Sequence, residues 1–93
     1  MPTFMLGHFN VGDYDTWKSN TFDRDPAGRV QAAKGHAISR SVDDPNEVFV
    51  RVEFGSVGEA RAFREKLMSS GALDNVEVRT PPTIVELADQ ATY

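Results

Sequence analysis

The segment Thr3–Asn10, TFMLGHFN, is apolar at both odd and even positions. As a strand it would place Phe4 and Leu6 on one face of a sheet and Met5 and Phe9 on the other. A strand that is apolar on both sides is typical of a sheet covered on both faces. Because the helices of one small domain cover a single face, this segment predicts that something else covers the second face.

Glycine, proline and a capping residue divide the next part of the chain. Asp13 follows Gly12 and is placed to cap a helix over about residues 14–23. Pro26 interrupts this pattern, and the sequence AGRVQAAKG then predicts a short second helical piece that stops at Gly35.

Two further strands and a longer helix are expected after this point. Residues 36–42 and 47–54 flank the turn sequence DDPN, which predicts a β-hairpin. Ser56 and Glu59 form the pattern of a capping box at the start of a helix that Gly71 ends. The apolar stripe predicted to face the sheet consists of Ala60, Phe63 and Leu67.

The last clear strand is predicted over residues 83–88, with a short extended piece over residues 75–79 before it. The order is then β-α-β-β-α-β, which right-handed crossovers turn into a four-stranded antiparallel sheet with both helices on one face. We therefore predict a single ferredoxin-like α+β domain over residues 1–93. The face of the sheet without helices would pack on the same face of a second copy. The resulting homodimer would enclose an interior for a small molecule.

Composition and charge exclude several classes of function. A net charge of -4 without a block of Lys or Arg argues against nucleic-acid binding. No apolar run approaches the roughly 18 residues of a membrane span, so a cytoplasmic protein is the simplest interpretation. The chain has no cysteine, its 2 histidines lie outside any ligand pattern, and no glycine-rich phosphate loop occurs. We thus expect neither a metal site nor a nucleotide cofactor.

Five stretches together resemble the dimeric α/β-barrel superfamily, in the branch of the antibiotic-biosynthesis monooxygenases and polyketide-cyclase-like proteins. They are VGDYDTWKSNTFD, RVQAAKG, DDPNEVFVRVEF, SVGEARAFREKL and PPTIVEL, which span nearly the whole chain. The resemblance implies a homodimeric barrel that acts without a cofactor on a small aromatic or polyketide-like metabolite, as a monooxygenase or cyclase. In the cofactor-free monooxygenases of this family, an electron-rich phenolic or anthrone-like substrate activates dioxygen itself. The alternative is a non-catalytic ligand-binding or accessory protein that uses the same pocket.

The predicted hairpin sorts side chains by face. If DDPN is a four-residue loop, one face of the hairpin carries charged and bulky side chains, as a pocket wall would. The side chains on the other face are small and mostly apolar. The pairs on the first face are Arg40 with Phe49, Ile38 with Arg51, and His36 with Glu53. The second face carries Ala37, Ser39, Ser41, Val48, Val50 and Val52.

Two histidines are the candidates for acid–base chemistry. Glu53 beside His36 would raise the pKa of the imidazole and fix its tautomer, as a general base requires. The alternative is an ordinary cross-strand ion pair. His8 shares a face with Phe4 and Leu6, and either donates a hydrogen bond to a substrate oxygen or bonds to the backbone in the core.

Substrate-binding candidates come from the aromatic and arginine residues. Trp17 and Phe22 would edge the pocket, although an aromatic residue at this helical spacing is most often part of the core. Arg40, Phe49 and Arg51 would line the pocket wall, with Arg51 steadying an oxyanion. Alternatively, the two arginines form salt bridges across the dimer or extend into solvent at the rim of the pocket. By contrast, Arg29 is expected to cap or solvate the short helix.

Overall fold

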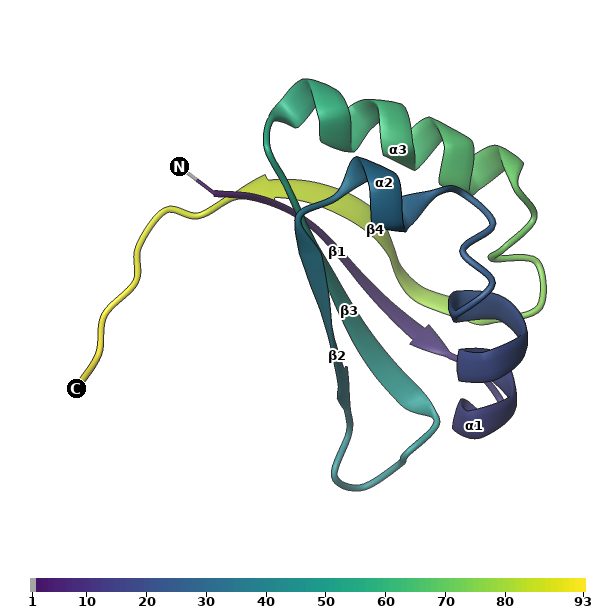
Figure 1. Ribbon diagram of the computed structural model, residues 1–93. Helices are drawn as coiled ribbons and strands as arrows, with labels where there is room; N and C mark the ends of the chain where they lie inside the picture. Colours follow the sequence, from purple (N-terminus) through teal and green to yellow (C-terminus); the bar gives the residue numbers. More distant parts are fainter. Residues whose placement is uncertain (1) are drawn as a thin grey trace.

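The computed structural model describes residues 2–93, which form a four-stranded antiparallel sheet with all helices on one face (Figure 1). The strands are β1 (Thr3–Asn10), β2 (Gly35–Arg40), β3 (Glu47–Phe54) and β4 (Glu77–Glu86). The helical segments are α1 (Tyr14–Trp17), the π-helical turn η1 (Lys18–Phe22), α2 (Arg29–Ala32) and α3 (Val57–Ser69). The sheet order β2-β3-β1-β4 is that of a ferredoxin-like fold, which confirms the predicted fold class.

Local side-chain hydrogen bonds start two of the helices where the sequence predicts. The Asp13 carboxylate accepts the backbone N–H of Thr16 at 2.9 Å, and Ser56 Oγ accepts that of Glu59 at 3.1 Å. The helix predicted over residues 14–23 is present, but its second half widens into η1.

The core lies between the helices and the facing side of the sheet. Under α3, Met5, Val52 and Phe54 pack against Ala60 and Phe63 of the helix. A second cluster beneath α1 consists of Phe9, Val11 and Val48, with Tyr14 and Trp17 packed on it. The stripe predicted for α3 is thus confirmed, since Leu67 also packs against the first cluster.

The predicted register of the β2–β3 hairpin is wrong by one residue. Ser41 donates its backbone N–H to the carbonyl of Glu47, so the loop has five residues, 42–46, rather than the four of DDPN. A slip of one residue moves every side chain of a strand to the opposite face. The observed pairs are His36 with Val52, Ile38 with Val50, Arg40 with Val48, Gly35 with Glu53, Ala37 with Arg51, and Ser39 with Phe49.

The predicted side-chain faces are therefore correct for one strand of the hairpin and wrong for the other. On β3 the prediction holds, because Val48 and Val52 lie under the helices while Phe49 and Arg51 face away. On β2 it fails: His36 and its neighbours of the same parity lie on the helix-covered face.

β4 is one continuous strand, where the sequence predicted two pieces. Leu6 pairs with Thr83 and His8 with Thr80, so Pro81 and Pro82 fall in an irregular stretch opposite Gly7. A strand tolerates prolines at such a bulge on the edge of a sheet, because the missing N–H groups remove no hydrogen bond between paired strands there. The two prolines thus bend β4 without ending it.

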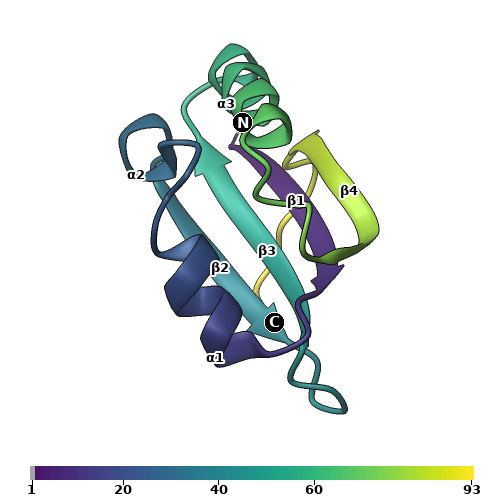
Figure 2. The same cartoon turned by 90° about the vertical axis from the view of Figure 1, so that its right-hand side faces the viewer.

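The second face of the sheet carries no helix (Figures 1 and 2). We call it the open face. Leu6 and Phe49 are 39% and 45% exposed on it, although both are large apolar residues. The segment after β4 also extends away from the body on the side opposite the helices (Figure 1). The second copy expected on the open face stays a prediction.

Candidate functional site

A cavity of about 80 Å³ lies between the helices and the covered face of the sheet. Its lining is almost entirely apolar and comes from β1, β3, η1, α3 and the segments around them. The lining includes Met5, Gly7, Val52, Phe63, Leu67 and Leu73. The sequence placed the ligand between two sheets, whereas this cavity lies inside one chain.

Aromatic rings from the first helical segment close one side of this cavity. Trp17 and Phe22 both line it, with their ring centroids 5.2 Å apart and tilted by 43°. Tyr14 packs on the far side of Trp17 and carries the Arg40 guanidinium 4.1 Å from its ring centroid. The structure therefore places the predicted binding residues Trp17 and Phe22 at the cavity, and Tyr14 behind them.

Arg29 reaches the same cavity from α2, which corrects its expected role as a solvated or capping side chain. The side chain is only 11% exposed, and its guanidinium carbon lies 3.7 Å from the centroid of the Phe22 ring. Nη1 donates to the Phe22 carbonyl at 3.3 Å. A four-residue helix gives no periodicity from which an inward-facing arginine could be predicted.

Asp25 explains why the chain turns so that α2 can begin. This residue has a φ of +53°, uncommon for a residue with a side chain. Its carboxylate accepts the backbone N–H groups of Arg29 at 2.6 Å and Val30 at 3.0 Å. The Asp25 carboxylate therefore secures the start of α2, at the edge of the cavity that it also lines.

His36 lies beside this site, edge-on to Phe22 with ring centroids 5.0 Å apart. Partial burial, and then the charges of Arg29 and Lys18, lower the pKa of His36 below its usual 6.5. The predicted rise in this pKa is wrong, because Glu53 pairs with Gly35 and lies on the other face. A lowered pKa keeps the imidazole neutral at neutral pH.

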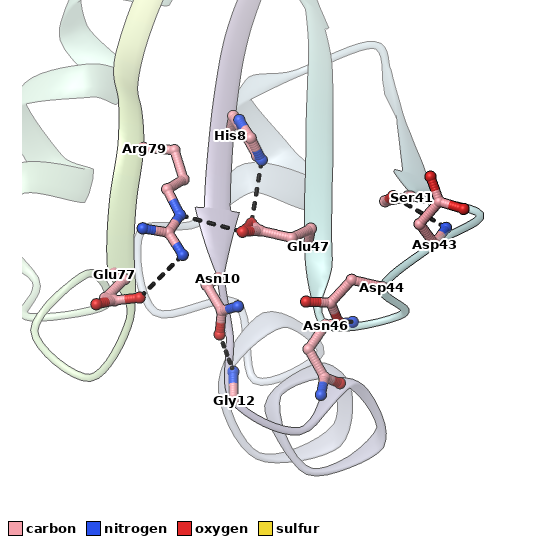
Figure 3. A network of polar contacts seen from close by, with 10 residues as sticks. All are labelled: His8, Asn10, Gly12, Ser41, Asp43, Asp44, Asn46, Glu47, Glu77 and Arg79. Carbon is pink, nitrogen blue, oxygen red and sulfur yellow. Dashed lines mark hydrogen bonds and ion pairs between the residues drawn. The ribbon is translucent and has the colours of Figure 1, made fainter.

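His8 belongs to a polar network on the open face (Figure 3). Its Nε2 lies 3.1 Å from Glu47 Oε2, and its ring stacks on Phe49 with centroids 4.0 Å apart. The other Glu47 oxygen accepts a hydrogen bond from Arg79 Nε at 3.1 Å, and Arg79 also pairs with Glu77. This network joins β1, β3 and β4 at one end of the sheet.

The sheet thus separates residues that the sequence assigned to one pocket wall. Trp17, Phe22, His36 and Arg40 lie on the helix-covered side, and Arg40 Nε donates to the Pro45 carbonyl at 2.9 Å. His8, Phe49, Arg51 and Glu53 lie on the open face, where the Arg51 guanidinium is 5.0 Å from the Phe4 ring centroid. One chain does not bring the two groups together.

Within residues 2–93, no three His, Asp or Glu side chains gather closely enough to hold a metal ion. No helix in the same range combines the length and apolar character that a bilayer crossing requires.

Comparison with protein-family models gave no match, and neither did comparison with curated protein sequences. Solved structures do match. SnoaB, a cofactor-independent oxygenase from Streptomyces nogalater, is 15% identical with a TM-score of 0.68, over 96% of this chain and 95% of that one. A candidate antibiotic biosynthesis monooxygenase from Bordetella bronchiseptica is 17% identical with a TM-score of 0.62, over 96% and 98%. A third, from Chloroflexus aurantiacus, is 9% identical with a TM-score of 0.63, over 99% and 98%.

Identities this low establish a shared fold and leave activity to be argued from the site. The fold of the single chain agrees with the sequence resemblance, whereas the dimeric barrel stays a prediction, and the matches extend over nearly the full length of both chains. This chain has the ferredoxin-like α+β fold of the antibiotic biosynthesis monooxygenase-like proteins.

Proposed function

We propose that this chain is a cofactor-independent monooxygenase or cyclase that binds a small aromatic or polyketide-like metabolite in the cavity beneath its helices. The observation that carries the proposal is the cavity itself, which is apolar and walled by Trp17, Phe22 and Phe63. Concave apolar sites with a few polar groups are typical of small-molecule binding, although at about 80 Å³ this cavity must widen to admit a fused-ring ligand. The fold is also that of SnoaB, described as a cofactor-independent oxygenase.

The proposed oxygenation uses the substrate, dioxygen as the oxidant and a base from the chain. A base removes a proton from the substrate, and the resulting enolate or phenolate gives one electron to dioxygen. Recombination of the two radicals forms a carbon–oxygen bond, and protonation gives a hydroperoxide. Loss of water then leaves a new carbonyl, so that anthrone and O₂ yield anthraquinone and H₂O. An apolar cavity excludes bulk water from these charged intermediates.

His36 is our candidate for the base. It lies on the helix-covered side of the sheet but outside the cavity lining, with its exposed ring edge-on to Phe22. Partial desolvation and nearby positive charge lower its pKa and favour the neutral imidazole. A general base must hold its acceptor nitrogen free at the operating pH. His8 and Arg51 are separated from this cavity by the sheet, so we assign them instead to the contact between two copies.

A homodimer formed through the open face completes the proposal. The exposed Leu6 and Phe49 lie at the centre of that face, and a small domain gains burial by self-association. In such a dimer the His8–Glu47–Arg79 network would lie at the contact and pair with groups of the second copy. We place this dimer in the cytoplasm.

The test is oxygen uptake with anthrone as substrate, followed by mass spectrometry of the product after reaction in isotopically labelled dioxygen. Enzymatic turnover gives anthraquinone with one labelled oxygen, at a rate above the background without protein. His36→Gln should lower this rate while leaving anthrone binding intact. Anthrone binding without uptake by the wild type would instead identify a ligand-binding accessory protein. Absence of both binding and uptake would contradict the proposal for this substrate class.

A further inference from the structure

We infer that the cavity recognises a ligand bearing a negatively charged oxygen, and that Arg29 is the residue that binds it. The inference rests on the proposed function in one respect, since it takes this cavity to be the ligand site. It adds the charge class of the ligand and the residue that selects it.

The first argument is the burial of a permanent charge. An arginine remains protonated in proteins, and a guanidinium removed from water is costly unless its N–H groups find partners. The Arg29 side chain is only 11% exposed, yet its polar contacts within residues 2–93 are both made by Nη1. They are the Phe22 carbonyl at 3.3 Å and the Asp25 carboxylate at 3.8 Å. No side-chain N or O atom within residues 2–93 is both fully buried and unpaired, so the remaining Arg29 donors keep some contact with solvent, from which a ligand oxygen could reach them.

The second argument is that the neighbouring acid is already occupied. Both oxygens of Asp25 accept backbone N–H groups at the start of α2, from Arg29 and Val30. The separation of 3.8 Å between its carboxylate and Nη1 exceeds the length of a hydrogen bond. Asp25 thus offsets the charge of Arg29 only partly.

The third argument is the fixed position of the guanidinium. It stacks on the Phe22 ring at 3.7 Å, and Phe22 and Arg29 both line the cavity. Stacking holds the plane of the guanidinium, so little side-chain freedom is lost when an oxyanion binds. The Lys18 ammonium, 5.5 Å from the same ring centroid, adds positive charge nearby, although it also pairs with Asp23.

These features fit an aromatic ligand with an ionised hydroxyl or carboxyl group. The apolar walls would hold the ring, and the guanidinium would donate two hydrogen bonds to the oxygen. In the proposed reaction, the same contact would favour the phenolate or enolate that transfers an electron to dioxygen.

The experiment compares para-nitrophenol with para-nitroanisole, its methyl ether, which cannot ionise. Binding is measured by calorimetry above the pKa of the phenol, and the phenolate absorbance gives the pKa of the bound molecule. We expect the wild type to prefer the phenolate and to lower the pKa of bound para-nitrophenol. Hydrogen bonds to charged groups contribute about 1.5–3 kcal/mol, so Arg29→Gln should reduce phenolate affinity roughly 10-fold to 100-fold.

Three variants make this result specific. Arg29→Lys should retain part of the preference, and Arg24→Gln removes the same charge at an exposed position and should change nothing. Asp25→Asn leaves one acceptor for the two N–H groups at the start of α2, so its fold is first checked by circular dichroism. A folded variant should bind phenolate more strongly, because it lacks a negative charge 3.8 Å from Nη1. Equal affinity of the wild type for the two probes would overturn the inference, as would equal losses in Arg29→Gln and Arg24→Gln.

The outcomes also separate this inference from the proposed function. Phenolate selectivity without oxygen uptake would support the anion site and count against the oxygenase. Oxygen uptake that Arg29→Gln leaves unchanged would support the oxygenase and overturn the role of Arg29.

Discussion

The ring of Phe9 lies across Gly7, two residues earlier on the same face of β1. A Cβ atom at residue 7 would stand 2.6 Å from Phe9 Cζ and 2.8 Å from Cε2. Gly7 also lines the cavity, so the missing side chain makes room for Phe9 and for the space beneath the helices. The glycine thus couples core packing to the shape of the site.

Gly7→Ala should therefore destabilise the protein. The added methyl group must displace a buried ring, and overpacking of this kind typically costs about 1–3 kcal/mol. Urea unfolding followed by circular dichroism measures the change. Gly35→Ala is the matched control, because a Cβ there meets nothing within 4 Å. Equal stability of the two variants would show that Phe9 moves aside without cost.

Leu67→Phe should abolish ligand binding while the fold remains stable. Leu67 lines the cavity, and the larger side chain fills space that a ligand would occupy. Filling a cavity commonly stabilises a protein by about 0.5–2 kcal/mol. Calorimetry with para-nitrophenol and thermal unfolding report the two effects. Met68→Phe, at the exposed neighbouring position, should change neither, and unaltered binding by Leu67→Phe would place the ligand elsewhere.

Leu6→Asp should convert the proposed dimer to a monomer. Leu6 lies on the open face, where a carboxylate from each copy would be buried without a partner. Sedimentation equilibrium should give about twice 10.3 kDa for the wild type and 10.3 kDa for the variant. Val42→Asp adds the same charge to the exposed hairpin loop and should stay dimeric. A wild-type monomer would refute the proposed use of the open face.

Acid should destabilise the fold through His36. Burial first, and then Arg29 and Lys18, lower the folded-state pKa below the usual 6.5, while Asp23 opposes the shift. The unfolded state then binds more protons, so stability is lost as pH falls from about 6.5 towards the folded-state pKa. Urea midpoints at several pH values should decline less steeply for His36→Gln than for the wild type. Parallel declines would show that other groups carry the acid sensitivity.

The elements that the sequence predicted well are those with local signals. Apolar residues at both odd and even positions predicted β1 and its two covered faces, and Ser56 with Glu59 predicted the start of α3. In β3, small apolar residues at alternate positions correctly predicted which side chains face the helices. These patterns depend only on near neighbours in the chain, which is why a single sequence reveals them.

The candidate site was harder to predict because it depends on turns. The hairpin loop has one residue more than DDPN suggests, and this moved His36 away from Glu53 and beside Phe22. Arg29 was expected to cap or solvate the short helix, since nothing in the neighbouring sequence reveals that Asp25 adopts a positive φ before α2. The position of the cavity depends on both turns and on the packing of η1.

The prolines of β4 have a consequence for how these molecules aggregate. Backbone N–H groups at a sheet edge recruit further strands, and this is the usual start of fibrous assembly. Neither Pro81 nor Pro82 has a backbone N–H to offer to a further strand, and the register shift opposite Gly7 makes the outline of the β4 edge irregular. The β4 edge is thereby protected from the addition of a strand from another molecule. Two copies could then associate through their open faces without further strands adding along β4.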